Sequence, residues 1–507
     1  MSRLIRFAAL LLLLIPVPAS AAVTCADLLK ALGSSLADVN CFVSPDLTTT
    51  NTTNDIKTST TPPNNSLPGL PPFAFTPITD RDVIAPSAAN RPPITKVVPG
   101  VQLNARIASD PQGQARFLLR LPNTWNGRLV VAGASGTRSE FNGDVAWSDY
   151  VLQKGYAYAS QNKGVLNLQL STAADPLACR LNPFTPVFVH FFDNDPGQQF
   201  TRWAQFMVKA AELARDGVKA AYGRWPAFTY AVGTSNGGYQ VRRAVEIAPK
   251  LFDGGVDWEG TFVDEHAPNL LTDLPPAILN FPDYVTSGFS AASTAAKNIQ
   301  AGGYPPDIAI PGTTTSLWGN YNGSFWEVTQ CQWQKRLDPT YDTYGSGTGT
   351  YNYVSRLSFS DVGAQFAAFA TTGDIQRPLV TVAGTMDGLL PIDHHARAYA
   401  RKVAAVAESE DRGRWEGGED RGQGNGNDKH QPAYRLYEVQ NGNHIETYKD
   451  TFSQLELIQP HARRAFDLLV GQVEGGAPLP PSQCIPHGSQ ILAAPAQPGH
   501  CAKLFVP

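Results

Sequence analysis

The sequence has no surplus of charge of either sign, since 40 lysines and arginines stand against 44 aspartates and glutamates, a formal net charge of −4. A chain balanced in this way has no electrostatic basis for binding nucleic acid, which requires a basic surface. Glycine and proline, with 44 and 40 of 507 residues, are too few for a collagen-like or low-complexity protein. The hydrophobic fraction of 42% allows a buried core and excludes a wholly disordered chain.

Apolar runs long enough to cross a membrane are also missing. Phe7–Ile15 is apolar but too short for a bilayer whose hydrocarbon core is about 30 Å thick. Arg3 and Arg6 precede this run and the small residues Ala19-Ser20-Ala21 follow it, which is the pattern of a cleaved secretory signal peptide. We therefore expect residues 1–21 to be removed, and the mature protein to be secreted or periplasmic without a membrane anchor.

Cysteine is sparse, and all six cysteines follow the expected cleavage site. An even number of cysteines in an exported protein favours disulfide bonds. Proximity in the sequence predicts the pairs Cys25–Cys41 and Cys484–Cys501. The two cysteines that remain, Cys179 and Cys331, are then expected to pair with each other. No Cys-x-x-Cys or His-x-x-x-His spacing occurs, so we predict neither a structural zinc site nor another metal or cofactor.

Changes in composition divide the mature chain into segments. Residues 22–97 are expected to form one short helix and then an extended strap rich in proline and threonine. Residues 98–264 and 376–507 alternate strand and helix patterns and are predicted to form one core. Residues 265–375 interrupt this alternation and are predicted to be a lid insertion. A charged, glycine-rich stretch near 408–430 is expected to be disordered.

The core segments carry short apolar runs separated by stretches with helical apolar spacing. Such runs are typical of strands buried on both faces of a sheet. They predict strands over Leu129–Ala132, Tyr156–Ser160, Phe228–Val232, Pro378–Gly384 and Tyr434–Val439. The alternation of these strands with helices predicts an α/β fold with a mostly parallel central sheet.

One of these strands leads into the segment Gly233-Thr234-Ser235-Asn236-Gly237-Gly238, and helical spacing follows over Tyr239–Ile247. A strand, a G-x-S-x-G turn and a helix predict a nucleophile elbow, because the tight turn needs glycines and exposes the serine hydroxyl. A glycine-rich phosphate-binding turn is the alternative, but neither G-x-G-x-x-G nor a P-loop lysine is present. Ser235 is therefore the predicted nucleophile.

A serine nucleophile needs a base that is oriented by an acid, and behind an elbow of this kind the acid precedes the histidine in the chain. Asp387 and His444 each follow a predicted strand at its carboxyl end, where α/β sheets place their sites. They are the predicted acid and base. Asp257 remains an alternative acid. His394 and His395 are weaker candidates for the base, since they begin a helix beside the acid.

The oxyanion formed during ester cleavage needs two backbone N–H donors. One is expected from Asn236, directly after the nucleophile. The other is expected from Ala134 or Ser135, in the loop after the strand at Leu129–Ala132, and the sequence does not decide between them.

Several segments resemble landmarks of the tannase and feruloyl esterase family. Besides the elbow, they are Leu121–Arg128, Lys154–Ala157, Leu251–Gly254 and Gly384–Asp387. The Ser-Asn-Gly-Gly sequence of the elbow also resembles that of secreted 3-hydroxybutyrate-oligomer hydrolases, over a shorter extent.

The family resemblance implies a secreted α/β-hydrolase with a large lid that cleaves esters, often of aromatic acids, and it assigns Ser235, Asp387 and His444 to the triad. The family's bridged cysteines, next to the nucleophile and the histidine, are replaced here by Thr234 and Ile445.

The predicted function is that of a secreted serine carboxylic-ester hydrolase acting on aromatic, oligomeric or polymeric esters. Trp258 and Trp326 are candidate substrate contacts, since aromatic rings offer large contact areas. A secreted serine peptidase of the same fold and a non-catalytic binding protein are the alternatives. The sequence does not predict an oligomeric state.

Overall fold

The computed structural model describes residues 23–55, 86–192, 200–266, 268–341, 350–416, 433–496 and 499–507. The predicted signal peptide lies outside these residues. Among the helices of the described residues, none combines the length and the apolar character needed to cross a membrane.

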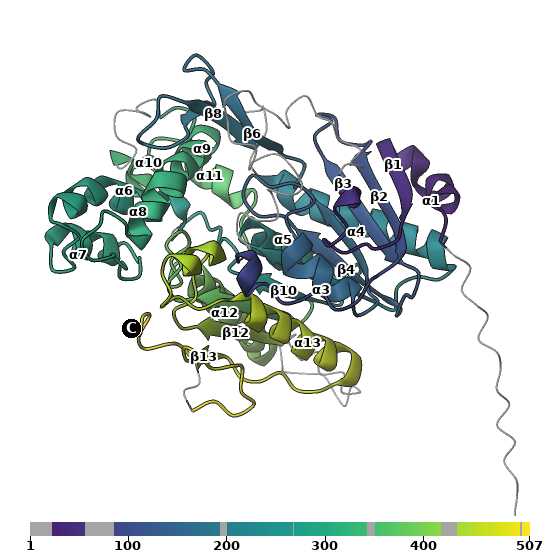
Figure 1. Ribbon diagram of the computed structural model, residues 1–507. Helices are drawn as coiled ribbons and strands as arrows, with labels where there is room; N and C mark the ends of the chain where they lie inside the picture. The colour runs from purple at the N-terminus through teal and green to yellow at the C-terminus, as the bar shows by residue number, and fades with distance from the viewer. Residues whose placement is uncertain are drawn as a thin grey trace, which may run out of the picture.

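A twisted sheet, ten-stranded in the described part of the chain, forms the centre of the molecule (Figure 1). In spatial order its strands are β1 (Leu36–Ser44), β2 (Gly100–Ile107), β3 (Arg116–Pro122), β5 (Ala157–Gln161), β4 (Arg128–Gly133), β9 (Phe228–Thr234), β10 (Gly254–Trp258), β11 (Leu379–Gly384), β12 (Tyr434–Val439) and β13 (Gln483–Ile485). The pairs from β1 to β5 are antiparallel, and those from β5 to β13 are parallel. The predicted α/β fold with a mostly parallel sheet is confirmed.

Helices cover both faces of this sheet. One face is packed by α1 (Cys25–Leu32), α4 (Thr201–Tyr222), α5 (Asn236–Ile247) and α12 (Ala396–Glu416), and the other by η5 (Asp144–Ser148), α3 (Asp149–Leu152) and α13 (Gln459–Gly475). Strand β4 shows why its apolar run is unbroken. Its Leu129 and Val131 side chains join the core under α4, while Val130 and Ala132 join the core under α13.

A lid lies to one side of the sheet (Figure 1). Its helices are α6 (Leu270–Thr286), α7 (Thr294–Ala301), α8 (Leu317–Tyr321), η6 (Asn322–Trp326), α9 (Glu327–Leu337), α10 (Tyr353–Arg356) and α11 (Val362–Ala367). A small antiparallel sheet accompanies them, in the order β6 (Leu166–Ser171), β8 (Phe188–Phe192) and β7 (Cys179–Arg180). The sequence analysis assigned these three strands to the core. The disulfide Cys179–Cys331 joins β7 to α9 and so attaches them to the lid.

The N-terminal segment contributes more to the sheet than the sequence predicted. The expected helix ends at Leu32, and after the short turn η1 (Gly33–Ser35) the chain forms the edge strand β1, tied to α1 by the disulfide Cys25–Cys41. In the described parts of the strap beyond β1, only the 3₁₀ turns η2 (Thr52–Asn54) and η4 (Ala88–Asn90) are regular.

The structure contains all three predicted disulfides, the third joining Cys484 and Cys501. It differs from prediction in the charged stretch near 408–430. Helix α12 continues through the first part of this stretch to Glu416, and residues 417–432 lie outside the described residues.

Candidate active site

Ser235 stands in a strained turn between β9 and α5. Its backbone angles, φ 59° and ψ −124°, cost a non-glycine residue about 1–3 kcal/mol. Close packing around the turn explains the flanking glycines. A Cβ atom on Gly233 would lie 2.3 Å from the carbonyl oxygen of Gly237, and one on Gly237 would lie 2.6 Å from that of Gly133. Backbones this close leave the serine as the side chain that the turn presents.

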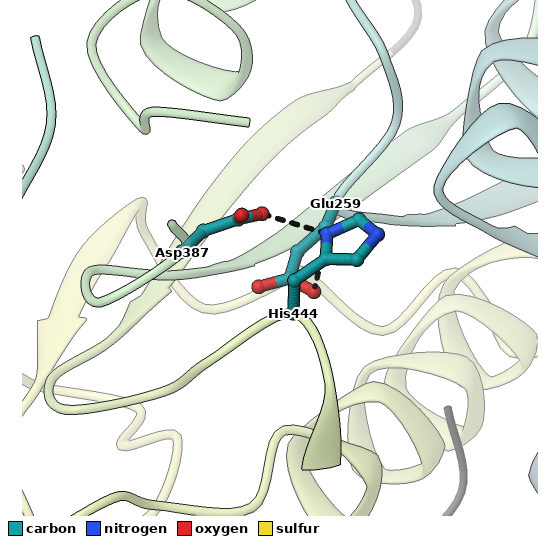
Figure 2. A group of neighbouring side chains, drawn as sticks. All are labelled: Glu259, Asp387 and His444. Carbon is teal, nitrogen blue, oxygen red and sulfur yellow. Dashed lines mark hydrogen bonds and ion pairs between the residues drawn. The ribbon is translucent and has the colours of Figure 1, made fainter. Parts of the chain in front are cut away.

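Asp387 and His444 meet across two neighbouring loops, after β11 and after β12. The imidazole Nδ1 lies 2.8 Å from Asp387 Oδ2, and both side chains are 2% exposed. The other carboxylate oxygen accepts the backbone N–H groups of Leu389 and Leu390, each at 2.7 Å. These bonds fix the carboxylate, and the carboxylate in turn orients the imidazole ring (Figure 2).

Ser235 and His444 line one cavity of about 380 Å³ at the carboxyl ends of the strands, under the lid. Among the described residues, no hydrogen bond joins the Ser235 hydroxyl to His444. Such bonds are often long before substrate binds. The structure thus places Ser235 and His444, the predicted nucleophile and base, in the lining of one cavity, and Asp387, the predicted acid, is bonded to His444.

Glu259 is a residue of this site that the sequence analysis missed. It follows the last residue of β10 with a left-handed φ of 51°, and its Oε2 lies 3.6 Å from the Nδ1 of His444 (Figure 2). Its Oε1 accepts the N–H of Gly384 at 2.9 Å. Burial, and then the charge of Asp387, raise the pKa of Glu259 well above the usual range.

Asp257, the alternative acid, does not approach the histidine. Its carboxylate is fully buried against α5, 2.6 Å from Arg242 Nε, and it also accepts the Gly260 N–H at 2.7 Å. The carboxyl group that does reach the site from this part of the chain is that of Glu259, two residues after Asp257 and directly after β10. The left-handed backbone at Glu259 turns the chain away from the strand, and this was not readable from the sequence.

Both loop amides that were predicted as the second oxyanion donor are already engaged. The Ala134 N–H donates to Gln240 Oε1 at 3.1 Å, and the Ser135 N–H donates to Asn142 Oδ1 at 3.0 Å. The next residue, Gly136, lines the cavity. Asn236 is the first residue of α5, so its N–H is one that the helix leaves unused.

The two tryptophans predicted as substrate contacts do not line the cavity. Trp258 is buried in the core between β10 and α13, where its ring packs edge-on against Trp147. Trp326 is fully buried in the lid core, and its Nε1 donates to the carbonyl of Gly388 at 2.7 Å. The neighbouring lid residue Phe325 lines the cavity instead, as do other aromatic side chains: Trp333 and Tyr448.

The two competing histidines hold the lid onto the core. His394 Nδ1 lies 2.8 Å and His395 Nε2 3.1 Å from the two carboxylate oxygens of Asp273, a fully buried residue of α6. His395 also accepts the N–H of Phe262 at 2.9 Å through its Nδ1. Both rings are therefore used in a buried polar contact away from Ser235.

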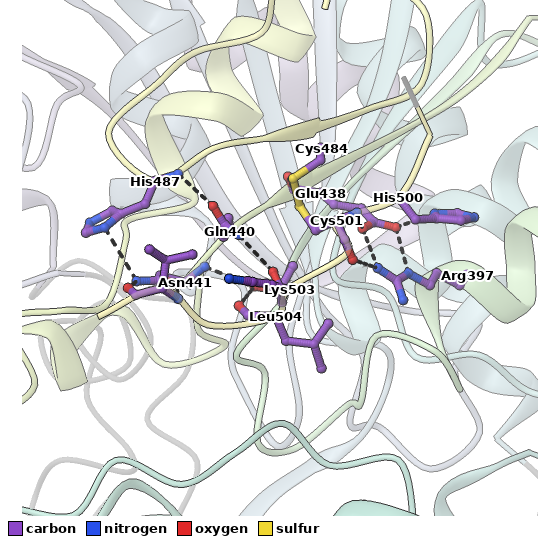
Figure 3. The surroundings of a disulfide bond; sticks show 12 residues. Arg397, Glu438, Gln440, Asn441, Cys484, His487, His500, Cys501, Lys503 and Leu504 are labelled. Carbon is purple, nitrogen blue, oxygen red and sulfur yellow. Dashed lines mark hydrogen bonds and ion pairs between the residues drawn. A yellow bond between two sulfur atoms is a disulfide. The ribbon is translucent and has the colours of Figure 1, made fainter. Parts of the chain in front are cut away.

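The C-terminal tail braces the loops that carry Asp387 and His444. Asn441, in the loop after β12, donates to the carbonyls of Val506 at 2.6 Å and Gln454 at 2.9 Å. Thr385, in the loop after β11, donates its hydroxyl to the Leu504 carbonyl and accepts the Asn441 N–H. The disulfide between Cys484 and Cys501 anchors the tail to β13 (Figure 3).

Two groups of side chains in the described part of the chain offer metal-ligand atoms. Glu259, Asp387 and His444 place three such atoms within 4.8 Å of one another, and a second group on the surface is Asp264, Glu265 and His266. In the first group His444 and Asp387 already bond to each other. Their arrangement is that of a histidine oriented by carboxyl groups.

No protein-family model matches the chain. A D-(-)-3-hydroxybutyrate oligomer hydrolase of Burkholderia thailandensis is 30% identical over 142 residues, which are 27% of this chain and 17% of that protein. The protein of the same name from Burkholderia mallei is 28% identical over 142 residues. The match thus spans about a sixth of the length of these relatives.

The solved structures to which the chain is similar include members of the family that its motifs resemble. Feruloyl esterase B from Aspergillus oryzae has a TM-score of 0.47 at 12% identity, over 89% of this chain and 90% of that one. Tannin acyl hydrolase from Aspergillus niger has a TM-score of 0.45 at 13% identity, over 90% of this chain and 87% of that one.

Proposed function

We propose that this protein is a serine carboxylic-ester hydrolase in which Ser235 is the nucleophile, His444 the general base and Asp387 the acid that orients it. One observation carries the proposal. Ser235, held in a strained strand-to-helix turn, lines the same cavity as the buried His444, and the Nδ1 atom of His444 lies 2.8 Å from the carboxylate of Asp387.

The reaction follows from these positions. The Ser235 hydroxyl attacks the ester carbonyl carbon while His444 Nε2 takes its proton, and Asp387 stabilises the imidazolium that forms. The tetrahedral intermediate collapses, and His444 gives the proton to the departing alcohol. Water then attacks the acyl-enzyme with His444 again as base, which releases the carboxylic acid and restores the serine.

The oxyanion of each tetrahedral intermediate needs two donors. We assign one to the Asn236 N–H at the start of α5. For the other we favour the N–H of Gly136, which lines the cavity, because the N–H groups of Ala134 and Ser135 already donate to Gln240 and Asn142. Those two bonds then serve to hold the loop in position.

The cavity favours an apolar acyl group. Its volume of about 380 Å³ is at the small end for ligand sites, enough for one aromatic ring or a short acyl chain. Six of the side chains that line it are Leu181, Leu270, Phe325, Val328, Trp333 and Leu389. We propose esters of aromatic acids or of short hydroxyalkanoate oligomers as substrates.

We further propose that the mature enzyme begins at Ala22 and works outside the cytoplasm. The amino-terminal sequence pattern and the three disulfides support this, since disulfides persist in oxidising compartments. The core and lid boundaries predicted above are retained in this proposal, with the segment of β6 to β8 added to the lid.

The test is hydrolysis of p-nitrophenyl esters with aromatic, short-chain and hydroxybutyrate acyl groups. We expect burst release of p-nitrophenol by the wild type, loss of activity in Ser235→Ala, and no effect of a metal chelator. Absence of turnover on every ester would contradict the proposal. Turnover of peptides at rates matching those of the esters would favour the peptidase alternative.

A further inference from the structure

Two carboxyl groups, not one, lie close to the Nδ1 atom of His444. Asp387 Oδ2 lies 2.8 Å from Nδ1, and Glu259 Oε2 lies 3.6 Å from the same nitrogen. All three side chains are at most 2% exposed. Figure 2 shows both carboxyl groups directed at this nitrogen while Nε2 points away from them. The Nε2 atom, which faces away from both carboxyl groups, is therefore the one available to the Ser235 hydroxyl.

The surroundings of Glu259 disfavour a negative charge on it. The titratable groups that face it are Asp387 and His444 from the two loops, Glu446 from η8 (Glu446–Asp450) and Tyr321 from α8. None of these is a permanently charged cation, and the Oε2 atom of Glu259 is buried without a hydrogen-bond partner among the described residues. Two adjacent ionised carboxylates would repel each other, so Glu259 is expected to keep its proton.

We propose that Glu259 is a positioning residue for His444, a neutral carboxyl group beside Asp387 that can become the acid partner of the histidine when Asp387 is removed. This inference rests on the proposed function. In the intact site the proton on Glu259 leaves His444 facing one negative charge. A second charge would favour the protonated imidazole, which cannot accept the proton of Ser235.

The decisive variant is Asp387→Ala, which removes the first carboxyl group without adding an amide that would compete for Nδ1. Its expected kcat/KM for a p-nitrophenyl ester is about 10- to 100-fold below the wild type, whereas Asp387→Ala/Glu259→Gln falls about 10⁴-fold, the loss that follows when a triad acid is removed without a substitute. The single variant should also need a higher pH for its activity, because Glu259 must ionise before it can act as partner.

A second double variant, Asp387→Ala/Glu446→Gln, is the matched control, since it removes another buried glutamate that does not contact His444. It should retain the activity of Asp387→Ala. The proposal is overturned if Asp387→Ala alone already loses about 10⁴-fold, or if both double variants lose the same activity. Thermal unfolding of each variant distinguishes a lost partner from a lost fold.

A readout without turnover separates this inference from the proposed function. In protein labelled with ¹³C at the glutamate carboxyl carbon, one signal that disappears in Glu259→Gln should stay in the protonated position at pH 7. In Asp387→Ala the same signal should move to the ionised position at a lower pH, since one source of repulsion is gone. A Glu259 signal that is already ionised at pH 7 in the wild type overturns the proposal, whether or not the protein cleaves esters.

Discussion

The side-chain amide of Asn441 forms hydrogen bonds with both the N–H and the carbonyl of Val506. Its Nδ2 donates to the Val506 carbonyl at 2.6 Å, and its Oδ1 accepts the Val506 N–H at 2.8 Å. Asn441 itself has a left-handed φ of 65° and is buried three residues before His444. The end of the chain therefore pairs with the loop that carries the proposed base, in a contact that resembles one step of a β-ladder.

Removing this contact should loosen the His444 loop. We expect Asn441→Ala to lower the free energy of unfolding by about 2–3 kcal/mol, because it removes the three hydrogen bonds that the side-chain amide of Asn441 makes with the backbones of Val506 and Gln454. We expect a lower kcat on p-nitrophenyl esters as well. Gln440→Ala, which removes the bonds to the Lys503 carbonyl and the His487 N–H, is the control and should change kcat little. Equal kcat values for the two variants would show that the contact does not position His444.

The disulfides Cys25–Cys41 and Cys484–Cys501 form a matched pair, since their sequence separations are 16 and 17. Chain entropy therefore predicts that replacing either pair with serine costs about 3 kcal/mol of stability. Their effects on kcat should differ, because only the second anchors the tail that contacts Thr385 and Asn441. Urea unfolding and ester kinetics on the two double variants check this, and a similar loss of kcat in both would refute it.

Three residues of the proposed site could be predicted from local pattern and chain order. Ser235 lies in a five-residue motif between a strand and a helix, and Asp387 and His444 follow strand ends in the order that the fold requires. Glu259 was not predictable, because its approach to His444 depends on one left-handed backbone angle after β10. Periodicity alone would leave it on the face of Asp257.

The lid was harder to predict because its packing has no simple period. The sequence marks it as rich in aromatics but does not say which ring faces the cavity. Phe325 and Trp326 are neighbours in the π-helical turn η6, and packing against Phe281 and Tyr304 places Trp326 in the lid core. The sequence also does not show that β6 to β8 belong with the lid. In the structure, the disulfide Cys179–Cys331 and the hydrogen bonds from Gln332 and Lys335 to the carbonyls of Leu177 and Ala178 join this segment to α9.

Glu446 should make the protein less stable as the pH rises. Burial raises its pKa to about 8 in the folded protein, although it accepts the N–H of Gln459 at 2.7 Å. Between the ordinary glutamate pKa and about 8, the unfolded chain has released this proton and the folded protein retains it, so stability falls with rising pH, by at most about 1.4 kcal/mol per unit. Above about 8 both states are ionised and the slope ends.

Urea unfolding at pH 5.5 and 7.5 tests this expectation. Wild type should lose stability over this interval relative to Glu446→Gln, which cannot ionise. Glu265→Gln, at a side chain that is 37% exposed, is the control and should keep the pH dependence of the wild type. Parallel curves for wild type and Glu446→Gln would show that Glu446 is ionised in the folded protein throughout.

Phe325 is the lid residue whose removal should alter substrate preference. It lines the cavity beside Val328 and Trp333, and its ring contacts that of Tyr321 at 5.9 Å between centroids. Phe325→Ala should raise KM for esters of aromatic acids about tenfold, the equivalent of about 1.4 kcal/mol of lost apolar contact, and leave acetate ester hydrolysis nearly unchanged. Phe359→Ala removes a ring that is 80% exposed on the lid and should change neither value. Equal losses on the acetate and aromatic esters would place Phe325 in the lid's framework and not in the acyl site, since a framework defect affects all substrates alike.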